Sequence, residues 1–434
     1  MAVLTPPDLG AQVGLIFPTM YAVQRVYQAD EVPEVPQDDL PARVRDELRN
    51  LQGRLRPGAH VAITAGSRGV ANIAAILHTC GEAVRAAGGD PFVIPAMGSH
   101  GGATAEGQTA VLAGYGVTPD TVGMPVVSNM EVREIGRVAD GMPVYLSVTA
   151  LEADHVLLVN RVKPHTDFRG SVESGLAKIC AIGLGKQRGA QTIHSYGSRG
   201  LAELMPQAAR CLVETTGKIV GGLAILENAF DRTASVHWVE PEGIAGPAEE
   251  ALQRRAKELL ASIPFDQVDV LVIEEMGKNI SGCGMDTNVI GRMWVPGVPE
   301  TERPRIQAIV VLDLTEASHG NATGIGLADF TTDHLVSKID WHATYVNGYT
   351  SGVGGLMRNR LPWVLPDDRA AIAAAIRMCG KPDPSTVRLV RVKNTLMVAH
   401  MEISESLLDE SPDVRVEVVG PPKPLAFDAA GRLV

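Results

Sequence analysis

The clearest pattern of apolar positions begins near residue 59. Residues 59–64 form an apolar run typical of a buried strand. From residue 70 to residue 87, apolar side chains recur every three or four positions, which predicts a helix with one apolar face. Gly88 and Gly89 follow, and glycine tolerates the left-handed conformation that ends many helices. A second apolar run at 91–96 completes a βαβ unit, which predicts a parallel sheet.

The same alternation continues along the chain. Further strands are predicted at 154–160, 268–273, 306–312, 387–392 and 396–400, and helices near 105–113, 328–338 and 367–378. The charged stretch 245–262 is interpreted as an interdomain helix and linker. We therefore predict two α/β domains, 1–264 and 265–434, with a mainly parallel sheet in the N-terminal domain and an interdomain active-site cleft.

Composition narrows the class of protein. A chain of 434 residues exceeds one ordinary core, and 45% hydrophobic with 21% charged residues excludes wholesale disorder. Its net charge of −11 argues against general nucleic-acid or membrane-surface binding. Five scattered cysteines without a C-x-x-C pair disfavour a disulfide scaffold or zinc ribbon. With no basic leader and no apolar run long enough to span a membrane, we expect a soluble, cytoplasmic protein.

Two glycine-rich turns follow the first predicted strands. Ser67, Arg68 and Gly69 lie between a strand and a helix, where free backbone N–H groups favour a phosphate. A plain turn with a surface arginine is the alternative. His100 has glycines on both sides, which would let its imidazole approach a ligand closely, although the residue taken alone favours a solvated loop histidine.

The most informative segment runs from residue 161 to residue 188. It holds a local excess of four positive charges, which predicts an anionic ligand unless acidic residues elsewhere compensate it. Lys178 lies in an apolar, glycine-rich setting that would lower its pKa and suit covalent attachment; otherwise it is a snorkelling lysine. His165 and, just beyond, His194 also occupy stretches that we interpret as turn-rich. Histidine can carry a proton or bind a metal, and it is often merely structural.

Three polar, glycine-rich stretches in the second half, at 278–288, 314–324 and 345–352, have the composition of ligand-facing loops. Each could equally be a surface loop. Lys278 and Arg292 are candidates for holding a substrate carboxylate, a hypothesis that rests on charge and loop position alone.

Four short motifs in series carry a family resemblance. Gly98-Ser99-His100, Lys163-Pro164-His165, Gly175-Leu176-Ala177-Lys178 and then His194 resemble the nickel-dependent lactate racemase family. These isomerases use a nickel-pincer nucleotide, pyridinium-3,5-bisthiocarboxylic acid mononucleotide nickel. The resemblance covers the N-terminal half well and extends more loosely to residues 284–292.

The resemblance implies a role for each matching residue. Lys178 would hold the cofactor covalently, His194 would complete the coordination of Ni²⁺, and His100 and His165 would be the paired acid/base groups. Ser67, Arg68 and Gly69 would line the nucleotide. The implied activity is a racemase or epimerase that inverts C2 of a 2-hydroxy acid by proton-coupled hydride transfer to and from the tethered cofactor. Cofactor-synthesis proteins would be partners.

The sequence also departs from the family's pattern. The interval from His165 to Lys178 is about three residues longer, the acidic residue of the first turn is Ala65 or Gly66 here, and the family's Gln/Lys pair has no clear counterpart. A larger or more polar 2-hydroxy acid than lactate, including a sugar acid, is therefore expected equally. The alternatives are an NAD-type dehydrogenase, disfavoured by the missing G-x-G-x-x-G, and a non-catalytic binding protein for an anionic metabolite.

Overall fold

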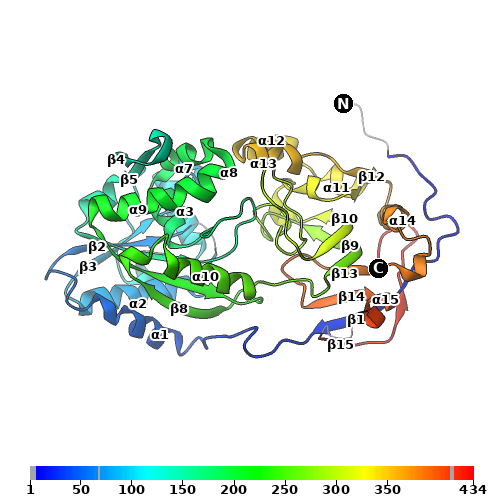
Figure 1. The fold of residues 1–434 in the computed structure, drawn as a ribbon, viewed down its shortest axis with the longest axis horizontal. Helices are drawn as coiled ribbons and strands as arrows, with labels where there is room; N and C mark the ends of the chain where they lie inside the picture. The colour runs from blue at the N-terminus through cyan, green and yellow to red at the C-terminus, as the bar shows by residue number, and fades with distance from the viewer. Residues whose placement is uncertain (1–5, 67–68, 411–414) are drawn as a thin grey trace. The chain divides into compact units, whose positions relative to one another are not determined.

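The computed structural model describes residues 6–66, 69–410 and 415–434. The chain forms two compact units. The first, which we call the central unit, is Ala29–Leu260. The second, the composite unit, joins Met1–Gln28 to Ala261–Val434. Both are α/β units, as predicted (Figure 1).

The central unit is built on a sheet of five strands in the order β3 (Asp90–Pro95), β2 (His60–Ala65), β6 (His155–Arg161), β7 (Ile219–Glu227) and β8 (Thr233–Val239). All neighbours are parallel except β7 and β8. The predicted βαβ unit is confirmed, with α2 (Ile73–Ala86) between β2 and β3 and Gly88 at a φ of 90° after it. The predicted helix near 105–113 is α3 (Ala105–Gly114).

Helices cover both faces of this sheet, so its strands are apolar along their whole length. On one face Ala62, Val156 and Leu158 pack with α7 (Lys186–Ser195) and α9 (Met205–Thr216). On the other face Ile63 and Leu157 pack with α1 (Leu40–Glu47) and α2 (Figure 1). The remaining elements of the unit are the helices α4 (Pro119–Val122), α5 (Val148–Glu152), α6 (Leu176–Lys178), α8 (Gly197–Arg199) and α10 (Pro247–Glu258), two π-helices (Ile179–Gly183 and Gly200–Leu204), and the ribbon of β4 (Val132–Arg137) and β5 (Pro143–Ser147).

The composite unit has a larger, mixed sheet. Its order is β12 (Trp363–Leu365), β11 (Phe330–Thr332), β10 (Arg305–Leu314), β9 (Gln267–Met276), β13 (Leu389–Val392), β14 (His400–Ser404), β1 (Thr19–Arg25) and β15 (Val416–Val418), with β16 (Lys423–Pro424) also on β1. The strands from β12 to β13 are parallel and the others are antiparallel. The alanine-rich helix α14 (Asp368–Met378) packs its buried face on β10 and β11. The helices α11 (Asp333–Ser337), α12 (Trp341–Thr350), α13 (Val353–Arg358) and α15 (Glu405–Glu410) complete the unit.

The first 28 residues correct the predicted domain limits. They were assigned to the N-terminal domain, but β1 pairs with β14 in antiparallel register from Met20 opposite Ser404 to Gln24 opposite His400. Met20 is buried in the same apolar cluster as Val270 of β9. A strand whose partner lies almost the whole chain away leaves no local signal of that pairing. The chain passes from the central to the composite unit between Leu260 and Ala261.

Four local predictions also need correction. The strand predicted at 396–400 lies instead at His400–Ser404, as β14. The stretch 245–262 is not a free linker, because α10 belongs to the central unit. Residues 330–332 form β11 rather than part of a helix, since Thr331 and Thr332 donate their hydroxyls to carbonyls of the adjacent β10. The stretch 345–352 lies largely in α12. No helix among the described residues combines the length and apolarity that crossing a membrane requires.

Candidate functional site

The candidate residues of the central unit gather at the carboxyl edge of its parallel strands. His100 follows β3, Gly69 follows β2 and His165 follows β6, and β2 is the strand in the middle. Because neighbouring strands are about 4.8 Å apart, the segments that carry His100 and His165 leave the sheet roughly 10 Å apart. Ser67 and Arg68 lie outside the described residues. Open α/β sheets bind ligands at this edge.

His165 is held with one ring nitrogen occupied. The backbone N–H of Asp167 donates to Nδ1 of His165 over 3.0 Å, and the Asp167 carboxylate lies 3.9 Å from the same nitrogen. In the neutral ring the proton therefore sits on Nε2, which acts as a donor. A protonated ring would be stabilised by the neighbouring carboxylate. Phe168 supports one face of the imidazole, with the ring centroids 4.7 Å apart.

A fully buried carboxylate, Glu173, holds the loop that carries His165. Its oxygens accept the backbone N–H of His165 over 2.8 Å and that of Gly170 over 3.3 Å. Lys257 of α10 donates to the same carboxylate over 2.6 Å. The charge of Glu173 is thus paired, as burial requires. The loop is fixed to α10 and does not depend on a ligand for its shape.

A second buried carboxylate, Glu249 of α10, fixes the turn just before Lys178. Glu249 accepts the backbone N–H of Ala177 over 2.9 Å and that of Ala245 over 2.8 Å. Burial raises the pKa of Glu249, whereas these backbone hydrogen bonds lower it. Gly175 has a φ of 153°, and a Cβ there would lie 2.5 Å from Oε1 of Glu249, so only glycine fits. Lys178 then leads into the π-helix Ile179–Gly183, a geometry often found at functional sites.

His194 lies in the last turn of α7, which corrects the interpretation of its surroundings as turn-rich. The side chain of His194 reaches solvent, but the part of it that is buried lowers the pKa of the imidazole. The charge of Lys178 lowers this pKa further, and the charge of Asp167 raises it. Charge effects of this kind act over short distances, so Lys178 and Asp167 lie near the imidazole. Within the described part of the chain, no hydrogen bond is made by the His194 ring. Lys178 and Asp167 thus both act on the charge of His194, and Asp167 also pairs with His165; we call these four residues the cluster.

The turn that carries His100 packs against the same elements. The N–H of Gly98 donates to the carbonyl of Gly183 over 3.3 Å, at the end of the π-helix. A Cβ on Gly98 would lie 3.3 Å from Cβ of Ala190, one turn before His194 on α7. Gly98 and Gly101 thus pack closely against neighbouring protein atoms, whereas a Cβ on Gly102 would meet open space. His100 itself is exposed.

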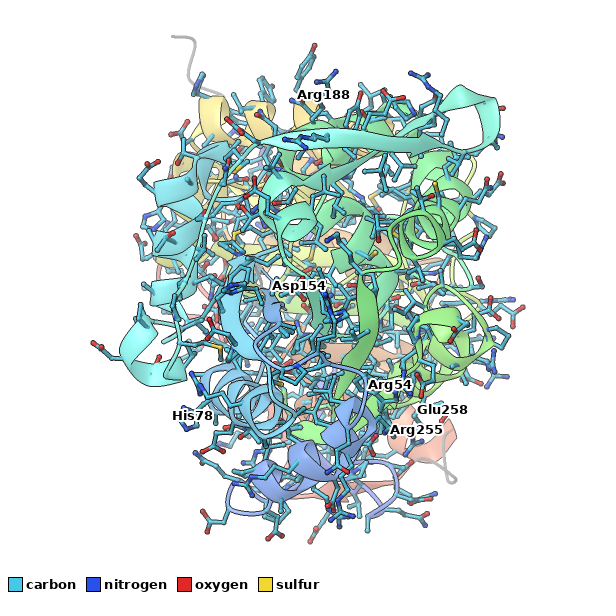
Figure 2. The ribbon with its side chains drawn as sticks, turned by 90° about the vertical axis from the view of Figure 1, so that its left-hand side faces the viewer. Arg54, His78, Asp154, Arg188, Arg255 and Glu258 are labelled. Atoms are coloured by element: carbon cyan, nitrogen blue, oxygen red, sulfur yellow. The ribbon has the colours of Figure 1, made fainter. Side chains whose placement is uncertain are left out.

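Part of the predicted excess of positive charge is compensated from outside the segment. Arg161 forms an ion pair with Glu227, whereas Glu173, which lies 3.9 Å from Arg169, already belongs to the segment. Arg188 projects outward, as Figure 2 shows, and lies over the ring of Tyr145 at 4.6 Å. The basic segment is therefore a weaker argument for an anionic ligand than its composition indicates.

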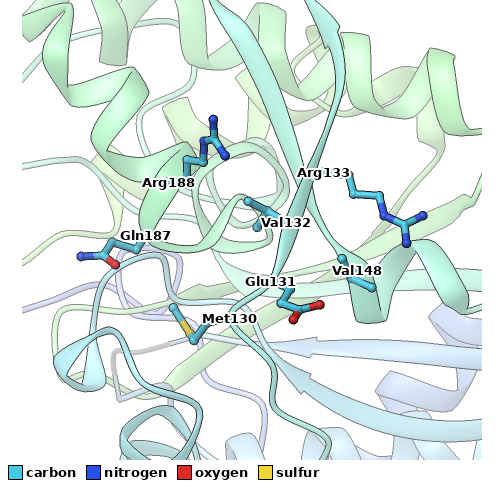
Figure 3. Close-up of a pocket in the computed structure, with 7 residues that line it drawn as sticks. All are labelled: Met130, Glu131, Val132, Arg133, Val148, Gln187 and Arg188. Carbon is cyan, nitrogen blue, oxygen red and sulfur yellow. The ribbon is translucent and has the colours of Figure 1, made fainter.

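A surface pocket of about 350 Å³ lies beside the β4–β5 ribbon, away from the residues predicted to act. Its lining is Met130, Glu131, Val132, Arg133, Val148, Gln187 and Arg188. The two arginine side chains lie on opposite sides of Val132 and do not converge (Figure 3). The pocket thus lacks the convergent polar groups of a specific ligand site.

The three candidate loops of the composite unit meet one another. Nζ of Lys278 donates to Oδ1 of Asn347 over 2.7 Å, and the amide of Asn321 donates to the same oxygen over 3.2 Å. The hydroxyl of Thr315 donates to Asn279 over 2.6 Å. These residues follow β9 and β10 or lie on α12, so amides, hydroxyls and one ammonium gather at one sheet edge.

Arg292 has a structural role, which corrects its assignment to the substrate carboxylate. Its side chain is largely buried, and its guanidinium donates to the Asp329 carboxylate and the Leu327 carbonyl, both over 2.8 Å. It also lies over the ring of Trp294 at 4.6 Å. A cation with these partners anchors its own loop.

Sequence reasoning missed the residues that hold the site in place. In the sequence, Glu173 and Asp167 count only as negative charges within the segment 161–188. Glu249 lies about 70 residues after the segment that it supports. Lys186 counted only among the positive charges of the segment 161–188, but it is buried. The one available signal was the acidic start of α10 after Gly246 and Pro247, which marks a helix N-terminus and not its partner.

No group of three or more His, Cys, Asp or Glu side chains in the described ranges could hold a metal ion. A metal bound mainly by a cofactor needs only one protein ligand, and such a site has no cluster of this kind. His194, with its ring nitrogens unengaged among described residues, has the donor chemistry for that single ligand.

Comparison with known proteins finds similarity to solved structures. No protein-family model matches this sequence, and no curated protein matches it either. A crystal structure of a protein from Thermotoga maritima is similar, with a TM-score of 0.49 and 12% identity over 82% of this chain and 97% of that chain. The lactate racemase apoprotein from Thermoanaerobacterium thermosaccharolyticum is also similar, with a TM-score of 0.46 and 10% identity over 87% and 99% of the two chains.

Proposed function

We propose that this protein is a racemase or epimerase that inverts the C2 stereocentre of a 2-hydroxy acid, with a nickel-pincer nucleotide attached to Lys178. The observation that carries the proposal is the cluster at the carboxyl edge of the central sheet. There the charges of Lys178 and of Asp167, the carboxylate beside His165, both act on His194. Four sequence motifs stand in the chain in the order of the lactate racemase family.

The residues present fit the proposed cofactor. Lys178 supplies a primary amine for covalent attachment, and Glu249 fixes the turn from which it projects. His194 supplies an imidazole for Ni²⁺. Gly69 is exposed at the end of β2, where backbone N–H groups suit a phosphate. When bound, the cofactor supplies a reversible two-electron acceptor for the hydrogen on C2.

The protein's own residues would handle the proton of the substrate hydroxyl. One histidine would take the hydroxyl proton as the hydrogen on C2 leaves, and would give that proton back to the oxygen when the hydrogen returns. For His165 to accept the proton at Nε2, its ring proton must first move to Nδ1, where the Asp167 carboxylate 3.9 Å away would stabilise the resulting cation. His100, whose strand ends roughly 10 Å from the strand that precedes His165, would serve the opposite face. Each enantiomer then meets one histidine.

Metal analysis and intact mass test this proposal together with a chiral assay. The full chain is produced with the cofactor-synthesis proteins and offered a panel of 2-hydroxy acids, sugar acids included. We expect one covalent adduct, about one nickel per chain and loss of optical activity with at least one substrate. Lys178→Ala removes the adduct, whereas His194→Ala keeps the adduct and loses nickel.

Lys178→Arg is the matched control, because it keeps the positive charge next to His194 but cannot form the link. An adduct that persists in Lys178→Arg excludes Lys178 as its site. Reversible nicotinamide binding with dehydrogenase turnover, or tight anion binding without adduct or turnover, would instead identify one of the two alternative functions.

A further inference from the structure

A buried lysine at the start of α7 has no role in the proposed chemistry. Lys186 is 1% exposed, and its Nζ donates to the carbonyl of Pro95 over 2.6 Å and to Oε1 of Gln108 over 2.9 Å. Burial lowers the pKa of Lys186 to about 8. Pro95 is the last residue of β3, so the ammonium lies under the strand end from which the His100 turn departs.

Gln108 links Lys186 to the turn that carries His100. It is fully buried on α3, and its Nε2 donates to the carbonyl of Gly98 over 2.9 Å and to that of His100 over 3.4 Å. An ammonium is only a donor and a carbonyl only an acceptor. The amide of Gln108 therefore has one orientation that satisfies all its partners, and Lys186 fixes that orientation.

The backbone at Lys186 is itself unusual. Its φ of 52° lies in the left-handed region, where a residue with a side chain costs free energy that glycine would avoid. A side chain in that conformation needs compensating contacts, and the only hydrogen bonds of its amine are those to Pro95 and Gln108 among the described residues. The strained first residue of α7 is thus hydrogen-bonded to the last residue of β3.

The same helix ends at the proposed nickel ligand. Lys186 is the first residue of α7, and His194 lies in its last turn. We propose that Lys186 and Gln108 are positioning residues that hold the His100 turn in fixed register with the helix that carries His194. The structural part stands alone, and its consequence for turnover rests on the proposed function.

Two variants test the inference on the full-length protein produced with the cofactor-synthesis proteins. Lys186→Met keeps the volume of the side chain and removes its amine. Gln108→Glu keeps an acceptor for Lys186, and even strengthens it, but removes both donors to the turn. Hydrogen exchange is read on residues 97–104, where the N–H of His100 bonds to Met97 and that of Ala103 to His100. We expect at least tenfold faster exchange there in both variants, with β6 unchanged.

Turnover gives the second readout. Because small misplacements of a reacting group cost about 10²-fold in rate, we expect kcat to fall about 10- to 100-fold. KM, nickel content and the Lys178 adduct should stay within twofold, a split that general destabilisation does not produce. Lys218→Met is the control, since Lys218 also donates to a backbone carbonyl, that of Ala153, but contacts neither α7 nor the turn. It should change neither readout.

Each outcome decides a separate question. Wild-type exchange in both variants overturns the inference. Faster exchange with unchanged kcat overturns the catalytic consequence. Faster exchange in a protein that is inactive on every substrate, even as wild type, upholds the structural link and contradicts the proposed function. If Lys186→Met does not fold, Gln108→Glu alone decides.

Discussion

The two units present different chemistry at corresponding sheet edges. At the carboxyl edge of the central sheet, the side chains ionise: His165 with Asp167, and Lys178 near His194. At the carboxyl ends of β9 and β10 in the composite unit, they are mainly amides and hydroxyls, such as Asn347. Ionisable groups move protons, whereas amides bind and orient without changing charge. On the proposed function, proton transfer belongs to this edge of the central sheet (the central edge), and the corresponding edge of the composite sheet (the composite edge) has the chemistry for hydrogen bonding.

The largest expected effect tests the central edge directly. His165→Ala or His100→Ala should lower kcat by about 10²- to 10⁴-fold, the range for a lost acid/base group, while the cofactor stays bound. Chiral chromatography of the product, beside the mass of the adduct, measures both. Normal racemisation by either variant contradicts the acid/base assignment of that histidine.

The next effect concerns the carboxylates that hold the central edge. Glu249→Ala leaves the N–H groups of Ala177 and Ala245 without an acceptor, and should lower the free energy of unfolding by about 2–4 kcal/mol. Urea unfolding measures this. Glu258→Ala on the same helix breaks only the exposed pair with Arg255, labelled in Figure 2, and should cost about 0.5 kcal/mol or less. Equal effects would remove Glu249 as a support.

Buried charge at the central edge also predicts a pH effect. The pKa of Lys186 is about 8 in the folded protein against 10.5 for the free side chain, so the unfolded chain binds more protons between these values. Stability should therefore rise with pH from about 8 to 10.5, by up to about 3 kcal/mol. Lys186→Met should lose that rise. Identical pH profiles of the unfolding free energy would show that Lys186 does not titrate in this window.

The smallest effect sharpens the role of the composite edge. Lys278→Ala should raise KM several-fold with little change in kcat, because it removes binding that substrate and transition state share. Arg292→Ala should leave KM unchanged and lower stability, since Arg292 binds Asp329 and Leu327. Steady-state kinetics with thermal unfolding separate the two. A reversed pattern would contradict the distinction between them.

How far the sequence determines this picture depends on the range of the interaction. The βαβ unit, α3 and α14 were predictable because their apolar spacing and their glycine or acidic ends are local. The pairing of β1 with β14 was not, since nothing near residue 20 indicates a partner near residue 402. The same holds for the site. His165 and Lys178 stood out by composition, whereas Glu249 and Gln108 act only through contacts that folding creates.

The most direct test of the central claim is the intact mass of the wild-type chain beside Lys178→Arg, each made with and without the cofactor-synthesis proteins. The account predicts a mass increase matching one nickel-pincer nucleotide in the wild-type protein made with those proteins, and in no other sample. A wild-type mass without that increase, or the same increase in Lys178→Arg, would contradict it.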